Sequence, residues 1–98
     1  MTRFAALIPA LFLATPILAQ DKEDICATSS GIVDLAVQAR SDGIAQKNAI
    51  GTIGDGLEGD AATYKPAVEP IVNWVYTLDE DLLNDDVGAS YEKACMEQ

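Results

Sequence analysis

The pattern of apolar and polar positions divides the chain into two unlike parts. Arg3 is followed by an uncharged apolar run, Phe4–Leu18, and then by the small residue Ala19. A positive start, an apolar stretch and a small residue at the cut are typical of a secretory signal peptide. The run is also shorter than the about 20 residues that a membrane span needs. We therefore predict that residues 1–19 are cleaved and that residues 20–98 form one small domain without stable membrane insertion.

Beyond the apolar run, hydrophobic residues recur at spacings of three and four, which is the period of an amphipathic helix. The third apolar segment is rich in β-branched residues, but no second run of alternating residues exists to pair with it as a strand. The pattern therefore predicts an all-α protein with four helices, over Glu23–Arg40, Ala45–Asp55, Pro66–Leu78 and Asp85–Glu97.

Residues with strong positional preferences mark the expected helix ends. Gly43 is expected to stop the first helix, because glycine readily adopts the left-handed conformation that follows many helices. The third helix is expected to begin at Pro66, or only at Pro70, since each proline removes a backbone donor. Asp85 or Asp86 is expected to cap the amino end of the fourth helix.

Two stretches leave local alternatives open. Thr28–Gly31 is a poor helical patch, so the first helix either continues through it or bends there. Asp79–Leu83 is expected to form a further helical turn or to continue the third helix.

The two cysteines, Cys26 and Cys95, lie near the two ends of the predicted domain. Exported proteins meet oxidising conditions, so one disulfide is expected. A redox-active pair is the alternative, but such cysteines usually lie close together as Cys-x-x-Cys. In an up-and-down bundle with short loops, these two positions share an end only if the number of helices is even. We therefore predict a small four-helix up-and-down bundle closed by one disulfide between the first and last helices.

The charge of the chain narrows the classes of partner. Sixteen acidic residues face 6 basic ones, a formal charge of -10, and loss of Arg3 with the signal peptide leaves -11. Nucleic acids and anionic membrane surfaces are bound through Lys and Arg, so we expect neither as a partner. The negative charge permits a cationic partner, although solubility alone is a sufficient reason for it.

The sequence lacks the common motifs for catalysis and for binding metals or phosphate. The chain has no His, which excludes imidazole metal sites and His-activated nucleophiles, and it has no phosphate-binding glycine motif. Gly54–Asp60 fails the spacing of a calcium loop, because Leu57 stands at the third position counted from Asp55, where an oxygen ligand is required. One alternative for the acids Asp79–Asp81, Asp85 and Asp86 is weak binding of a divalent ion, but such a cluster more often lies on an exposed face and favours helix N-termini. We expect no metal, no cofactor and no catalytic residue.

Trp74 and Tyr76 are the candidate partner-binding residues. If Val72 and Val75 face the core, these two rings point partly elsewhere and form an aromatic patch for a partner. The alternative is that both rings cap a thin core. Arg40, the only arginine of the predicted mature chain, is expected to cap the carboxyl end of the first helix or to pair with an acid.

Short motifs carry two resemblances. Cys26 lies early in the first helix, Arg40 and Gly43 form an Arg-x-x-Gly at its end, and Tyr91 and Cys95 form a Tyr-x-x-x-Cys. This arrangement resembles small exported two-cysteine helical proteins of bacteria whose function is unknown. The chain is also similar in class to the HdeA-type acid-stress chaperones of the periplasm, which are small, helical, exported and carry one disulfide. Their cysteines lie closer in sequence, and the motif around them is missing here.

These observations favour a non-enzymatic binding or accessory protein of the cell envelope, periplasmic or secreted, with an envelope protein or a cationic molecule as its partner. The HdeA-type resemblance implies an acid-stress chaperone as an alternative, whose fold would loosen as its carboxylates become protonated. A small hydrolase that uses two carboxylates is a further alternative, and it would need a deep cleft with two facing acids.

Overall fold

The computed structural model describes the backbone of residues 2–98 and the side chains of residues 21–98. The predicted signal peptide, residues 1–19, lies outside the residues whose side chains are described, and it stays a prediction. The all-helical fold class is confirmed. The helices are α1 (Thr2–Ser41), α2 (Gln46–Gly56), α3 (Lys65–Val75) and α4 (Asp86–Met96), with 3-10 turns η1 (Gly59–Tyr64) and η2 (Glu80–Leu82).

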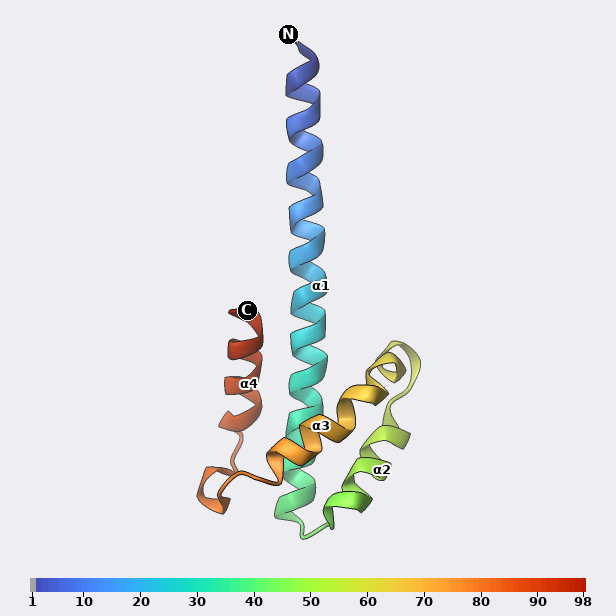
Figure 1. Ribbon diagram of the computed structural model, residues 1–98, viewed down its shortest axis with the longest axis vertical. Coiled ribbons are helices and arrows are strands. Elements are labelled where there is room, and N and C mark those ends of the chain that lie inside the picture. The colour runs from blue at the N-terminus through green and yellow to red at the C-terminus, as the bar shows by residue number, and fades with distance from the viewer. Residues whose placement is uncertain (1) are drawn as a thin grey trace.

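The four helices follow an up-and-down order, as the sequence predicts. In Figure 1, α1 runs downward, α2 returns upward, α3 crosses α1 obliquely on its way down, and α4 runs upward beside α1. The first and last helices are therefore antiparallel neighbours. This order brings Cys26 and Cys95 together, and their sulfurs form a disulfide with the Cα atoms 5.6 Å apart.

The core is built by the first three helices. Ile32, Val33 and Ala36 of α1 are almost fully buried, and they pack with side chains of α2 and α3. By contrast, Gly88 is the only buried residue of α4. The remaining buried members of the core are Val37, Ala39, Ala49, Ile53, Val68, Ile71, Val72 and Val75.

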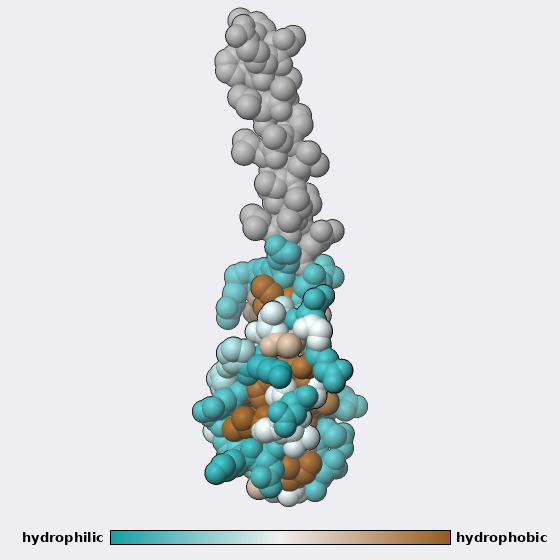
Figure 2. Space-filling model, turned by 90° about the vertical axis from the view of Figure 1, so that its right-hand side faces the viewer, coloured by the Kyte–Doolittle hydropathy of each residue, from teal (hydrophilic) through white to brown (hydrophobic). Residues whose placement is uncertain are grey.

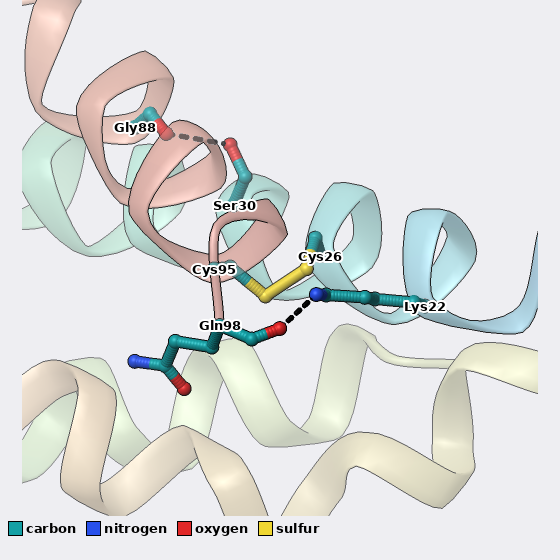
Figure 3. Close-up of a disulfide and its surroundings, with 6 residues drawn as sticks. All are labelled: Lys22, Cys26, Ser30, Gly88, Cys95 and Gln98. Atoms are coloured by element: carbon teal, nitrogen blue, oxygen red, sulfur yellow. Dashed lines mark hydrogen bonds between the residues drawn. A yellow bond between two sulfur atoms is a disulfide. The ribbon is translucent and has the colours of Figure 1, made fainter. Parts of the chain in front are cut away.

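Because α4 contributes so little to the core, its attachment to α1 depends on a row of specific contacts (Figure 3). Cys95 is bonded to Cys26, and the hydroxyl of Ser30 donates a hydrogen bond of 2.9 Å to the carbonyl of Gly88. Lys22 Nζ donates to the backbone carbonyl of Gln98. These contacts line one side of α1 over more than two helical turns.

Gly88 allows α4 to approach α1 closely. A Cβ at this position would lie 2.0 Å from Oδ1 of Asp34 and 2.8 Å from its Cγ. The approach also explains the poor helical patch at Thr28–Gly31: α1 continues through it without a break, and Ser29 and Ser30 are buried. Small side chains there reduce helix propensity but leave room for a neighbouring backbone.

The end of α1 confirms the stop expected at Gly43. Its φ is +81°, its N–H donates to the carbonyl of Arg40 at 3.0 Å, and the N–H of Ile44 donates to the carbonyl of Ala39 at 2.9 Å. These two bonds are those of a Schellman motif, which satisfies carbonyls that the helix itself leaves free.

Two expected starts of helices need correction. The third helix begins at Lys65 and contains Pro70, so the expectation that it begins only at Pro70 is wrong. Pro70 removes one hydrogen bond near the first turn, which the packing of the same helix offsets. Asp85 does occupy the N-cap position of α4, as expected, but its side chain makes no capping hydrogen bond. Instead, Oδ1 of Asn84 accepts the N–H of Asp86 at 2.8 Å, because Asn often bonds the backbone two residues ahead.

Two of the connections between helices contain a 3-10 turn, η1 between α2 and α3 and η2 between α3 and α4. Of the two alternatives for Asp79–Leu83, the separate turn is correct, since η2 is divided from the end of α3 by the residues that follow Val75. The glycine-rich end of α2 leads into η1, which passes the chain directly to Lys65 at the start of α3.

Removing the disulfide tests how far α4 depends on it. The bond closes a loop with a sequence separation of 69 residues. Loss of such a link costs about 4 kcal/mol on chain-entropy grounds. We expect the double variant Cys26→Ala/Cys95→Ala to show a urea unfolding free energy lower by about this amount. A loss below about 1 kcal/mol would mean that the other contacts hold α4 by themselves.

Gly88→Ala tests the close approach of α4 to Asp34. Alanine is favoured over glycine in helices by up to about 1 kcal/mol. In an Asp34→Ala background we expect Gly88→Ala to stabilise the fold. In the wild-type background, contact of the new Cβ with the Asp34 carboxylate should cancel or reverse that gain. Urea unfolding of all four proteins measures the coupling, and an equal effect in both backgrounds would contradict the close contact.

Candidate functional site

Trp74 is a large aromatic side chain that the fold leaves partly in solvent. Val68, Ile71, Val72 and Val75 form the buried face of α3, and Trp74 lies beside this face with 41% of its surface exposed. α4 brings Tyr91 next to it, with the two ring centroids 5.9 Å apart and the planes tilted by 45°. Tilted aromatic pairs at this distance attract each other, because the positive edge of one ring lies near the negative face of the other.

Two hollows open beside Trp74. The first, of about 300 Å³, is lined by Ala67, Pro70, Ile71, Trp74 and Tyr91, and we call it the proline hollow. The second, of about 270 Å³, lies toward the start of α4, and we call it the aspartate hollow. Its lining residues are Trp74, Leu78, Leu82, Asn84, Asp86, Val87 and Ser90.

Together, Trp74, Tyr91 and the two hollows make up the Trp74 surface. The proline hollow is apolar except for the tyrosine hydroxyl, whereas the aspartate hollow combines apolar side chains with a carboxylate, an amide and a hydroxyl. Leu82, at its edge, has 53% of its surface exposed. A mixed surface of this kind can take up apolar and polar groups of a partner at the same time.

Acidic residues crowd the carboxyl-terminal side of the Trp74 surface. After Trp74 the chain carries seven acids and one base, Lys93. Five of these acids, at 79–81 and 85–86, lie in η2, at the start of α4 or directly before one of them, and all five are exposed. The face formed by α2 and η1 differs: there, hydrophobic residues lie in separate patches among hydrophilic ones (Figure 2).

The structure separates Tyr76 from Trp74. The hydroxyl of Tyr76 donates a hydrogen bond of 2.6 Å to the carbonyl of Ile44, just after α1 ends, and its ring lies 5.9 Å from the guanidinium of Arg40. Burial raises the pKa of Tyr76, and the positive charge of Arg40 lowers it in part. Tyr76 therefore joins α3 to the corner between α1 and α2, while Trp74 faces α4.

Arg40 takes neither of the two expected roles. Its Nη1 donates to the carbonyl of Val75 at 2.8 Å and to the carbonyl of Leu78, so it caps the carboxyl end of α3 and not that of α1. The carbonyls of Ala39 and Arg40 already accept the N–H groups after α1, which leaves the guanidinium available for another helix. A cation at the carboxyl end of a helix is favoured by the helix dipole.

One hollow of the structure is lined by two acids, the residue type that the hydrolase alternative requires. A hollow of about 600 Å³ is lined by Asp24 of α1 and Asp60 of η1, together with Thr28, Thr63 and Tyr64. Both carboxylates are exposed to solvent. Among the described side chains, no three acids or cysteines gather where they could hold a metal ion.

Comparison with protein families, with curated proteins and with solved structures finds no match to this chain. Within the residues that the structure describes, no helix is both long enough and apolar enough to cross a membrane.

Sequence reasoning selected Trp74 but not its neighbours. Tyr91 enters the sequence analysis only through the Tyr-x-x-x-Cys motif, and its position beside Trp74 comes from the attachment of α4 to α1. Asp86 drew attention only as a helix cap and as one of several clustered acids, and Leu82 gave no signal, so neither pointed to a hollow beside Trp74. The acids clustered at 79–81 and 85–86 were the one sequence feature that indicated the negative charge of this surface.

Tyr76→Phe tests the corner between α1, α2 and α3. Loss of the hydroxyl removes the hydrogen bond to Ile44, and we expect the free energy of unfolding to fall by about 1 kcal/mol at neutral pH. Because the pKa of Tyr76 is raised in the fold, its contribution is complete below the ordinary tyrosine pKa of about 10 and is lost as the pH rises through the folded value. Unfolding free energies should therefore decline more steeply above about pH 10 in the wild type than in Tyr76→Phe, and parallel profiles would refute this role.

Proposed function

We propose that this chain is a non-enzymatic binding protein of the cell envelope and that it engages its partner through the Trp74 surface. The observation that carries the proposal is the 41% exposure of Trp74 between two hollows. Tryptophan is enriched among the residues that dominate the binding energy of protein interfaces. A partner that covers the ring would gain the hydrophobic free energy that folding leaves unused.

The support of the ring favours binding over simple capping of the core. Tyr91 on α4 limits the movement of Trp74 on one side, and the buried residues of α3 anchor its backbone. A side chain that is already held in place loses less conformational entropy when a partner binds. Two hollows remain beside it, which offer recesses for side chains of the partner.

The placement in the envelope is supported by the predicted signal peptide and by the disulfide. A bond between Cys26 and Cys95 persists in oxidising compartments such as the periplasm or the extracellular space. The attachment of α4 depends on this bond, and so does the position of Tyr91 beside Trp74. The Trp74 surface is therefore expected to be complete only where the bond can form.

Site-directed photo-crosslinking tests this proposal in living cells. A photoreactive phenylalanine derivative replaces Trp74 in one variant and Leu35 in a matched control. Leu35 is 50% exposed on α1 and lines neither hollow. We expect position 74 to give a discrete crosslinked species that an excess of uncrosslinked protein competes away, and position 35 to give none. The same pattern from both positions, or no species from position 74, would contradict the proposal.

Fluorescence provides an independent check, because Trp74 is the only tryptophan of the chain. Emission from the folded protein is expected to be intermediate between that of a buried and that of a fully hydrated indole. A strongly blue-shifted emission would show that the ring only caps the core.

A further inference from the structure

The two hollows beside Trp74 differ in chemistry, and this difference limits what can occupy both. The proline hollow has an apolar lining made by Ala67, Pro70 and Ile71. The aspartate hollow adds the carboxylate of Asp86 to its apolar walls. Trp74 lines both hollows, so a ligand that fills them passes across the indole ring.

The aspartate hollow fits the side chain of a lysine or an arginine. Its volume of about 270 Å³ lies just below the range of about 300–1,000 Å³ that is usual for small-molecule pockets, and it suits a single long side chain. The methylene groups of such a side chain can pack on Leu78, Leu82 and Val87 while its charge meets Asp86. The indole ring at the wall is the aromatic group that binds cations best.

The charge around the site favours the same occupant. The acids at 79–81 and 85 lie in the segments next to the aspartate hollow, and Lys93 is the only base between Trp74 and the end of the chain. Their summed negative potential raises the local concentration of cations and the rate of encounter. A second copy of this chain, which carries a formal charge of -10, would meet repulsion at the same place.

We propose that the Trp74 surface binds a basic, amphipathic peptide segment of a partner protein. An apolar side chain of the segment enters the proline hollow, and a Lys or Arg enters the aspartate hollow, where Asp86 and Trp74 hold its charge. The inference rests on the proposed function, because it names the chemistry of the partner at that same surface. A free polyamine would satisfy Asp86 but would leave the proline hollow unfilled.

Three short synthetic peptides serve as probes, one of Lys and Leu, one of Glu and Leu and one of Lys and Ser. Each is titrated into the full mature protein while Trp74 emission is followed. We expect saturable binding of the Lys and Leu peptide with a blue shift, weaker binding of the Lys and Ser peptide, and none of the Glu and Leu peptide. Equal binding of the Lys and Leu peptide and the Lys and Ser peptide would show that the proline hollow contributes nothing to binding. Binding of the Glu and Leu peptide would overturn the proposal.

Asp86→Asn measures the contribution of the single carboxylate in the aspartate hollow. Asp55→Asn on α2 is the matched control, because it removes the same charge from an exposed residue that lines neither hollow. Pairing between exposed charges contributes modestly, so we expect Asp86→Asn to weaken binding of the Lys and Leu peptide by about two- to fivefold. Asp55→Asn should leave the affinity within error. An equal loss in both variants would show that the peptide responds to net charge alone.

The two proposals fail in different ways. If no basic peptide binds while position 74 still crosslinks a competable partner, the inference about a basic segment is wrong and the Trp74 surface remains a binding site. If the peptides bind as expected and position 74 crosslinks nothing in cells, the surface has the proposed chemistry and the proposed cellular function is wrong.

Discussion

The attachment of α4 to α1 is the constraint on which the rest of this structure depends. α4 has no large buried side chain, so hydrophobic burial alone does not hold it. The disulfide lowers the conformational entropy of the unfolded chain. The hydrogen bond from Ser30 to Gly88 fixes where α4 lies along the axis of α1. Gly88 suits the same place because a Cβ there would meet the side chain of Asp34 on α1.

A second set of attaching contacts lies at the carboxyl end of α3. Arg40 bonds the carbonyls of Val75 and Leu78, and Tyr76 bonds the carbonyl of Ile44. These contacts satisfy backbone groups that a helix end otherwise leaves to water, and they join three helices at one corner. As a result, α3 is held along its buried face and at its carboxyl end, while Trp74 remains on the free side.

The two attachments together explain why an exposed tryptophan is compatible with a rigid surface. The corner at Arg40 fixes the helix that carries Trp74, and the disulfide fixes the helix that carries Tyr91 and Asp86. A surface held from both sides is organised before a partner arrives, and this reduces the entropy that binding must offset. The acids of η2 and α4 give the same surface its negative field.

The sequence by itself determined the helical fold class, the number of helices and the disulfide. Periodicity locates amphipathic helices, and two cysteines at the ends of an up-and-down bundle require an even count. The stop at Gly43 was also local, because it depends on the backbone of one residue. The carboxyl end of α3 was different: its cap, Arg40, comes from a helix distant in sequence, and local rules assigned that residue to its own helix.

Only the tertiary structure decided which aromatic residue stays partly exposed and which one bonds another part of the fold. Trp74 lies in the last turn of α3 and Tyr76 just after its end, so their side chains point in different directions, and the neighbours on each side set their roles. The pairing of Trp74 with Tyr91 and Asp86 follows from how closely α4 packs on α1. That packing includes the contact between Gly88 and the side chain of Asp34, a long-range contact that no local pattern in the sequence records.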